Sequence, residues 1–406
     1  MADIVVLGAG MAGVGAALAL QARGHAVRLV DQHAPGEETS FGNAGIIQAE
    51  ACVPYEFPRA PLTLLKYALG LSNDLVIDYH KLPAMLKPLW QYFNLSSAKS
   101  HAAITKTYAQ LIARGVEAHA PLIEAADAGD LIRTNGFGEI YQTNKGFDAA
   151  AKQAEIWAQD YDLMMELWPG DTLHKHEAKL RTTPAGTVFW GDSWSCRNPG
   201  ALAKAYGALF EARGGTLMQM KLRSAQPTAT GWQVQSSTGR LETQHLVVAL
   251  GPWSPAFLQP LGYDIPMVMK RGYHSHYHCS TPPERGYFLA DDGVVVSDMD
   301  QGVRITTGAH LTSQGAPENL RQLHRGRAAA GEIFDLGTEI ENSRWQGTRP
   351  CLPQMVPLVG AAPKHRGLWF HFGHGHQGFT LGPATGEILA RVMDGDTDRL
   401  SDALAP

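Results

Sequence analysis

The sequence predicts an α/β protein of two domains, one of which is interrupted by the other. A strand–helix–strand pattern opens the chain at residues 3–32. A strand of the same buried character, residues 246–250, returns after a long insertion that contains strands and helices of its own. The length of 406 residues exceeds one ordinary domain and suits two or three.

Composition narrows the classes of partner and compartment. A net charge of −5 lacks the basic surplus that nucleic acid or an acidic membrane surface requires of a principal partner. The cysteines are far apart and form no CxxC motif, which fits free thiols in a reducing compartment; they are Cys52, Cys196, Cys279 and Cys351. Without a signal sequence or a run of eighteen apolar residues, we expect a cytosolic protein with no transmembrane helix.

The first strand–helix–strand unit carries a glycine motif. Residues 4–7 form a continuously apolar strand, residues 11–21 have the apolar spacing of a helix, and residues 27–30 form a second buried strand. Between the first strand and the helix lies a GxGxxG sequence, made of Gly8, Ala9, Gly10, Met11, Ala12 and Gly13. Asp31, followed by Gln32, ends the second strand, which completes the dinucleotide-binding fingerprint.

Each residue of this fingerprint has a physical task. Gly8 makes the tight turn, and Gly10 lets the backbone approach a pyrophosphate held at the helix N-terminus. Gly13 allows close packing of helix on strand, and Asp31 accepts a hydrogen bond from a ribose hydroxyl. The motif alone does not separate a nicotinamide from a flavin dinucleotide. The small, glycine-rich segment 37–50 could pass close to a flat ring, but its composition alone favours a surface loop.

The middle of the chain mixes helices and strands. Residues 55–126 look helical with proline breaks, and segments 61–71 and 85–93 are so apolar that they predict either core or a surface for a membrane or partner. Residues 131–143 read as a hairpin around Asn135-Gly136. We further predict helices at 148–167, 199–213, 317–334 and 383–393, and strands at 186–192, 246–250, 266–278 and 367–373, with two strands within 294–311.

Two histidine groups raise the question of a metal. In the strand 266–278, alternation places His274, His276 and His278 on one face, but neighbours on that face are about 7 Å apart, too far to share one zinc ion easily. His371, His374 and His376 fall within six positions near the C-terminus. We expect no metal at either place.

Taken together, these segments resemble the D-amino-acid oxidase/dehydrogenase superfamily of FAD-dependent amine oxidoreductases over essentially the whole chain, and most of all its bacterial D-amino-acid dehydrogenase and glycine-oxidase-like branch. The motifs that carry the resemblance are GAGMAG with Asp31, TSFGNAG (39–45), RGYH (271–274), GAH (308–310), WQGTRPCLP (345–353) and GHGHQGFTLGPATG (373–386). The last two, in this order, are the most specific.

The resemblance implies a discontinuous Rossmann-type FAD-binding domain, residues 1–50, 197–262 and 345–406, and a mixed-sheet substrate domain, residues 51–196 and 263–344. It implies non-covalent FAD, because Cys351 does not fall on the covalent attachment position of related oxidases. Beyond the fingerprint, the cofactor contacts it implies are Thr39, Ser40, Asn43, Ala44, Gly45, Ile46, Leu222, Gly251, Gly373, His374, Gly375, Gln377, Gly378, Phe379 and Thr380.

The resemblance also implies a substrate site. Arg349 matches the arginine that grips a substrate carboxylate with a planar fork; the alternative is a structural ion pair. Candidate catalytic residues beside it are His376, His274 and Tyr273, and the expected pocket lining is Ile46, Val296 and Leu311. Val296 stands where several relatives have a carboxylate-binding tyrosine.

The implied activity is oxidative deamination of an amino acid, with a D-amino acid as the first expectation. Thr380 stands where sarcosine-type oxidases carry a lysine that assists oxygen, which favours a quinone or electron-transfer protein as acceptor over oxygen. Two alternatives stay open. One is the same chemistry on glycine-type, N-substituted or cyclic amino acids. The other is a flavoprotein subunit that docks a partner, or the inner membrane peripherally, through residues 61–93.

Overall fold

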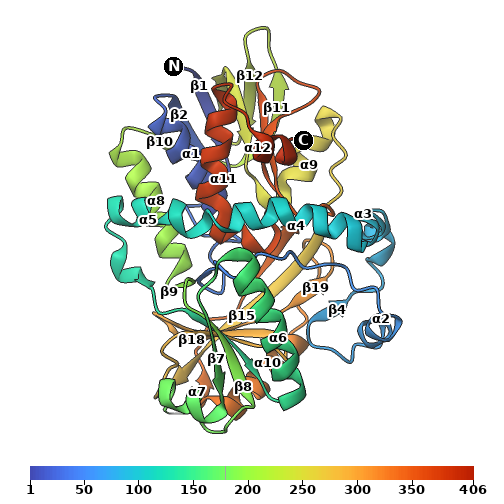
Figure 1. Cartoon of the computed structure of the whole chain (residues 1–406). Coiled ribbons are helices and arrows are strands. Elements are labelled where there is room, and N and C mark those ends of the chain that lie inside the picture. The colour runs from blue at the N-terminus through green and yellow to red at the C-terminus, as the bar shows by residue number, and fades with distance from the viewer. Residues whose placement is uncertain (179) are drawn as a thin grey trace.

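The computed structural model describes residues 1–178 and 180–406. A six-stranded sheet forms one end of the molecule, in the order β10-β2-β1-β14-β23-β22 (Figure 1). Its strands are β1 (Asp3–Leu7), β2 (Ala26–Asp31), β10 (Thr216–Gln219), β14 (His245–Val248), β22 (Leu358–Ala361) and β23 (Leu368–Phe372). All neighbours pair in parallel except β22 and β23. The N-terminal strands, the strand predicted at 246–250 and the C-terminal strand therefore share one sheet.

Helices from distant parts of the sequence cover this sheet. They are α1 (Met11–Ala22), α8 (Pro199–Ala212), α11 (Gly378–Met393) and α12 (Arg399–Leu404). Strand β1 buries Ile4 and Val6 with helix α1 in one core, and Val5 and Leu7 in a second core on the other face, as a parallel sheet covered on both faces requires. The predicted last helix begins five residues earlier than residue 383, and Pro383 lies inside it.

Glycines set the close packing of α1 on α11. A Cβ on Gly15 would lie 2.8 Å from the Gly382 carbonyl oxygen, and a Cβ on Gly382 would lie 2.8 Å from backbone atoms of Met11. Both distances are too short for any side chain, so the two backbones touch directly. This contact brings the start of α11 beside the start of α1, where the glycine motif lies.

A large sheet of eleven strands forms the other end of the molecule (Figure 1). Nine strands run in the order β4-β19-β15-β18-β17-β16-β6-β8-β7, and β20 and β21 also pair with β15. The strands are β4 (Leu75–Ile77), β6 (Phe137–Tyr141), β7 (Met165–Pro169), β8 (Gly186–Trp190), β15 (Val268–Cys279), β16 (Gly286–Leu289), β17 (Val294–Met299), β18 (Gly302–Thr306), β19 (Ala309–Leu311), β20 (Leu336–Glu339) and β21 (Trp345–Cys351). The predicted strand 266–278 is confirmed as β15, the longest strand of the sheet.

The remaining helices and strands surround these two sheets. The helices are α2 (Pro61–Ala68), α3 (Leu82–Leu95), α4 (Ala98–Ile112), α5 (Gly115–Ala125), α6 (Asn144–Tyr161), α7 (Gly170–His176), α9 (Ser254–Leu258) and α10 (Arg321–Ile333). One three-stranded sheet joins β3 (Ile46–Ile47), β9 (Trp194–Cys196) and β5 (Ile132–Arg133), and another joins β11 (Leu222–Pro227), β12 (Trp232–Ser236) and β13 (Arg240–Thr243). Short 3₁₀ turns lie at Gly129–Leu131, Gly251–Trp253, Gln259–Leu261 and Gly375–Gln377.

Three local predictions differ from the structure. The hairpin at 131–143 is wrong, because β5 pairs with β9 while β6 joins the large sheet. The segment 294–311 holds three strands rather than two. The helix predicted at 148–167 ends at Tyr161, and residues from Met165 onward form β7.

The structure assigns two segments to a different domain from the one expected from the sequence. Strand β21 pairs with β15 along seven residues, so residues 345–351 belong to the large sheet rather than to the dinucleotide end. Helices α4 and α5 pack against the core of α1 and α11, although the sequence assigned residues 51–196 to the substrate domain.

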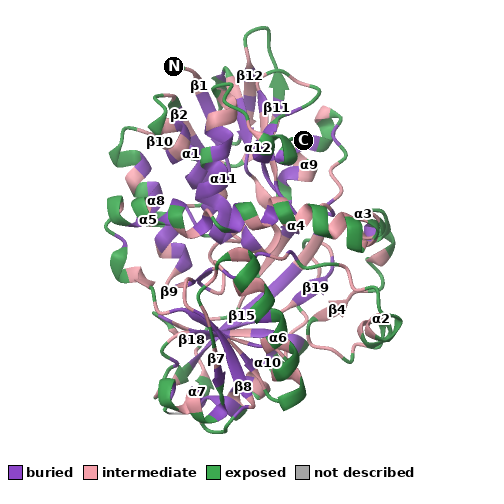
Figure 2. Ribbon diagram, viewed as in Figure 1, coloured by how far each residue is buried: buried purple, intermediate pink, exposed green. Residues whose placement is uncertain are grey.

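Helices α2 and α3 carry the apolar segments 61–71 and 85–93. Figure 2 shows α2 almost wholly at intermediate or full exposure, and no residue of α2 is buried. The large apolar side chains exposed here are Leu62, Leu65, Leu69, Leu71, Leu86 and Trp90. Residues 61–71 therefore form surface, whereas α3 also buries Met85, Pro88 and Tyr92, so residues 85–93 contribute both to the surface and to the core. Among the described residues, no helix combines the length and apolar character needed to cross a membrane.

Candidate active site

A large cavity of about 1540 Å³ lies between the two sheets. It reaches from the glycine motif at Gly8 and Asp31 to Arg349 and the strands of the large sheet. Ordinary small-molecule sites measure roughly 300–1,000 Å³. This cavity therefore has room for a large cofactor and a small substrate together.

The glycine motif forms one end of the cavity. The Asp31 carboxylate accepts hydrogen bonds from the backbone N–H groups of Ala9 (2.6 Å) and His33 (3.0 Å). The Ser40 hydroxyl accepts from the N–H of Met11 at 2.9 Å, which joins the segment after β2 to the start of α1. Gly13 lies outside the cavity: a Cβ there would stand 1.7 Å from the Gly8 carbonyl oxygen, so it serves the predicted close packing.

Most of the predicted cofactor contacts line this cavity. Those that do are Gly8, Gly10, Met11, Ala12, Asp31, Gln32, Thr39, Ser40, Asn43, Ala44, Ile46, Leu222, Gly251, His374, Gly375, Gln377, Gly378 and Phe379. Gly45 instead holds a positive φ of 76° against the Cys196 carbonyl, and Gly373 packs on Leu352. The Thr380 hydroxyl is buried and accepts from the N–H of Gln48 at 3.2 Å.

A buried arginine that the sequence analysis missed holds the segment after β2 in place. The Arg304 guanidinium donates to the carbonyls of Phe41 (3.1 Å) and Asn43 (2.6 Å), and to Nε2 of His276 (3.0 Å). His276 therefore acts as an acceptor for Arg304. No sequence motif marks Arg304, because its role depends on β18 lying beneath a segment some 260 residues earlier.

The C-terminal histidines have two different roles. The hydroxyl of Thr385, on α11, lies 2.9 Å from Nε2 of His371 and 2.8 Å from Nε2 of His374, and it donates to the Leu381 carbonyl. Two imidazoles thus tie β23 and the following turn to α11. Within the described part of the chain, no group of three or more His, Cys, Asp or Glu residues is arranged to hold a metal ion.

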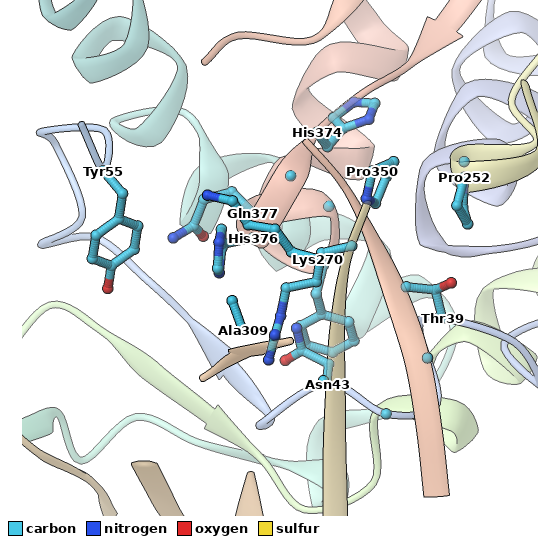
Figure 3. Close-up of a pocket in the computed structure, with 18 of the residues that line it drawn as sticks. Thr39, Asn43, Tyr55, Pro252, Lys270, Ala309, Pro350, His374, His376 and Gln377 are labelled. Carbon is cyan, nitrogen blue, oxygen red and sulfur yellow. The ribbon is translucent and has the colours of Figure 1, made fainter. Parts of the chain in front are cut away.

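His376 faces the cavity. Its ring centroid lies 5.3 Å from that of Tyr55 (Figure 3). Burial holds the pKa of His376 well below its ordinary value, and the nearby cations Arg349 and Lys270 lower it further. The imidazole is therefore neutral near pH 7.

Arg349 projects from β21 into the cavity. Its Nη1 donates to the Gly308 carbonyl at 2.8 Å and its Nη2 to the Thr307 carbonyl at 2.9 Å. The guanidinium packs over Gly272, where a Cβ would lie 2.7 Å from Nη1. No acid pairs with Arg349 among residues 1–178 and 180–406, so the structural ion pair considered above is absent from the described chain.

Lys270 is a second cation that the sequence analysis did not select. It lines the cavity from β15 and is directly opposite Arg349 in the β15–β21 pairing. Its ammonium lies 4.9 Å from the Tyr92 ring centroid. Two like charges facing each other across strands are unfavourable unless an anion lies between or beside them. The pair could have been found only once the register was known.

Two candidate catalytic residues lie outside the cavity lining. Lys270 and Gly272 line the cavity, so alternation along β15 turns Tyr273 to the opposite face, where its hydroxyl bonds His310 and the N–H of Asn319. His274 is on the cavity side but is covered by Trp345, which stacks on it at 5.2 Å. Burial lowers the pKa of His274 to about 2.

The predicted substrate-pocket lining is correct at two positions and displaced at a third. Ile46 and Leu311 line the cavity. Val296 does not: it lies in the core behind β17, with Ile305, and Val295 faces the cavity instead. A difference of one residue along a strand moves the side chain to the other face of the sheet.

The shape and chemistry of the cavity fit a dinucleotide that carries a flat ring. Glycine backbone and the acceptor Asp31 lie at one end, and small residues continue along residues 42–44 and 375–378.

Comparison with known proteins gives the same result. Residues 3–392 match the family described as FAD dependent oxidoreductase. The chain is 27% identical to a D-amino-acid oxidase of Bradyrhizobium diazoefficiens, over 97% of this chain and 95% of that protein. It is 28% identical to a D-amino acid dehydrogenase of Rhizobium johnstonii, over 97% and 96%.

Two solved structures share the fold. They are a glycine oxidase from Bacillus cereus (TM-score 0.72, 18% identity, 100% of this chain and 99% of that chain) and an iminodiacetate oxidase from Chelativorans sp. (TM-score 0.73, 20% identity, 99% and 98%). Because the family match extends over nearly the whole chain, the protein belongs to the FAD-dependent oxidoreductases and uses FAD as its cofactor.

Proposed function

We propose that this protein oxidises an amino acid at its α-carbon to an imino acid, which water converts to a 2-oxo acid and ammonia. A D-amino acid is the first candidate, because the curated relatives named above are a D-amino-acid oxidase and a D-amino acid dehydrogenase. Glycine-type, N-substituted and cyclic amino acids are the second candidates.

The observation that carries this proposal is the pair of cations in the cavity. Arg349 is oriented by two backbone carbonyls and has no acidic partner in the described chain, and Lys270 faces it across β15 and β21. A guanidinium that uses two N–H groups on the protein keeps three for a ligand, enough for a bidentate carboxylate. We therefore assign the substrate carboxylate to Arg349, with Lys270 as a second positive charge beside it.

Positioning supplies most of the catalysis in this proposal. Bound FAD supplies the acceptor for the hydride that leaves the α-carbon. The nitrogen lone pair forms the C=N bond as the hydride leaves, so the substrate must react with its amine neutral. The substrate therefore binds with its amine already neutral; the imidazole of the neutral His376 can accept a hydrogen bond from that amine, and Arg349 fixes the carboxylate.

The direct test is an anaerobic screen of the holoenzyme. D-amino acids, L-amino acids and N-methyl glycines are mixed with the protein without oxygen, and the flavin absorbance is followed. We expect bleaching with at least one D-amino acid. Bleaching by none of the three classes would refute the proposal, and bleaching by N-methyl glycines alone would transfer it to the second candidates.

Electrons must then pass to an acceptor, which we propose to be a membrane quinone. Leu86 and Trp90 both line the cavity and stand 57% and 64% exposed, so α3 joins the cavity to the surface. Lys66 and Lys81 accompany the exposed leucines of α2 and α3, while Lys87 pairs with Asp264. Apolar side chains with interspersed lysines suit the surface of an anionic bilayer.

Vesicle co-sedimentation tests this surface. The wild-type holoenzyme should sediment with vesicles of anionic lipid, and a Leu65→Asp/Trp90→Asp variant should stay in the supernatant. Ile156→Asp, which alters a 52% exposed apolar residue on α6, is the matched control and should bind as the wild type does. If the wild-type protein does not sediment with the vesicles, the proposed membrane contact is refuted.

A further inference from the structure

Two glutamates line the cavity without any cation beside them. Glu50 follows β3 and is 5% exposed; its carboxyl oxygens accept hydrogen bonds from the Ser193 hydroxyl and the Gln48 amide. Glu139, on β6, accepts from the Tyr141 hydroxyl at 2.8 Å and the Trp190 indole N–H at 3.1 Å. In the described residues neither carboxyl takes part in an ion pair.

Neutral donors orient these carboxyls but do not balance a charge. Burial raises the pKa of Glu50 to about 7, and the nearby Glu139 adds to the effect; burial raises the pKa of Glu139 as well. A buried carboxylate is costly unless a cation pairs with it. Each glutamate retains acceptor capacity after its two protein hydrogen bonds, because a carboxylate offers about four lone-pair sites.

Gln377 supplies an independent sign that a donor is missing. Its amide N–H₂ donates to Gln48 at 2.7 Å, and Gln48 in turn donates to Glu50. The Gln377 side-chain oxygen is buried, and Gln377 lines the same cavity; none of the residues that the structure describes donates a hydrogen bond to this oxygen. Figure 3 shows this amide reaching toward the side of the cavity on which Tyr55 lies. The chain Gln377–Gln48–Glu50 thus presents acceptors to the cavity.

The lining of the cavity therefore includes two acidic residues, Glu50 and Glu139, and two basic ones, Lys270 and Arg349. Tyr55 is 63% exposed, but it lines the cavity, and the surrounding protein raises its pKa to about 12. Glu139 and Glu50 raise that pKa further and Arg349 lowers it, so all three charges act on one hydroxyl. A ligand near Tyr55 is within the electrostatic reach of Glu50, Glu139 and Arg349.

We propose that Glu50 and Glu139 form an acidic subsite that selects substrates with a cationic nitrogen at the end of the side chain, such as an amino or guanidino group. This rests on the proposed function, in which Arg349 holds the carboxylate. The α-amine cannot supply the cation, because it must be neutral to react. A second nitrogen in the side chain satisfies the unpaired carboxyls and the Gln377 oxygen together.

Binding of two unreactive acids to the holoenzyme tests the subsite. 6-Aminohexanoate carries a carboxylate and a terminal ammonium but no α-nitrogen, and hexanoate lacks the ammonium. By calorimetry we expect 6-aminohexanoate to bind at least about tenfold more tightly, the effect of one charged hydrogen bond. Glu50→Gln and Glu139→Gln should each reduce this ratio, whereas Glu341→Gln, at an exposed position outside the cavity, should leave it unchanged.

Kinetics give a second readout. The ratio of kcat/KM for lysine to that for norleucine should fall in both cavity variants, with norleucine little affected. Equal binding of the two acids to the wild type, or equal losses for lysine and norleucine, would overturn the subsite. The wild-type screen separates the two proposals: oxidation of neutral amino acids alone removes the subsite and keeps the activity, whereas oxidation of none removes the activity itself.

Discussion

Replacement of Arg349 by alanine tests the assignment of the substrate carboxylate. Two of the five N–H groups of the guanidinium are used by the Gly308 and Thr307 carbonyls, so a carboxylate can receive two charged hydrogen bonds from the rest. Each such bond contributes about 1.5–3 kcal/mol. Two correspond to about 3–6 kcal/mol, or roughly 10²- to 10⁴-fold in kcat/KM.

The assay compares an amino acid with the amine that lacks its carboxylate. Arg349→Ala should lose roughly 10²- to 10⁴-fold in kcat/KM on the amino acid, mostly through KM, and little on the amine. Arg349→Lys should recover part of the loss, because an ammonium keeps the charge but not the planar fork. Flavin content and thermal unfolding show whether the variants remain intact. An equal loss on both substrates would refute the role of Arg349.

Three further outcomes follow from the packing and from the buried histidines. Gly382→Ala inserts a Cβ 2.8 Å from the α1 backbone and should lower the free energy of unfolding by about 1–3 kcal/mol, whereas Gly129→Ala, which meets open space, should not. Gly10→Val places a side chain where the pyrophosphate approaches, so the purified variant should lack flavin colour. Acid precipitation of the wild type should release its flavin into the supernatant. Flavin that stays with the precipitated protein would show that the cofactor is covalently bound. His119 and His276 are buried with pKa values of about 4, so they are neutral in the folded protein while the unfolded chain takes up protons below about pH 6.5. Urea unfolding should therefore show stability falling from about pH 6.5 toward pH 4, by at most roughly 1.4 kcal/mol per pH unit for each histidine, and equal stability at both ends would contradict this.

The dinucleotide end was predictable because its requirements are local. One strand–helix–strand unit contains Gly8, Gly10, Gly13 and Asp31. The role of each depends on neighbours that are close in sequence. The same holds for β15, whose length and alternation were visible in the sequence. The start of α11 was missed, because Pro383 was read as a boundary although it lies within the second turn of the helix.

The substrate side was predictable only in part, because its geometry depends on register between distant strands. Lys270 faces Arg349 only because β21 leaves the dinucleotide end and pairs with β15. Val295 rather than Val296 faces the cavity because the register of β17 with β16 places Val295 opposite Phe288, which also lines the cavity. Glu50 gave no signal in the sequence, since one acid in a polar segment looks like solvated surface.

The two cations facing each other across β15 and β21 lead to a last prediction, on Lys270→Met. Like charges at directly opposed positions destabilise a sheet by up to about 1 kcal/mol, and methionine keeps most of the side-chain volume. The ligand-free variant should therefore be equal to or more stable than the wild type in thermal unfolding, while its KM for the amino acid rises. Arg271→Met is the contrasting change, because Arg271 is also on β15 but donates to backbone carbonyls at residues 313, 316 and 317; it should lose stability. A Lys270→Met protein that is clearly less stable, with KM unchanged, would mean that the ammonium serves the fold, and the anion-binding role would then rest on Arg349 alone.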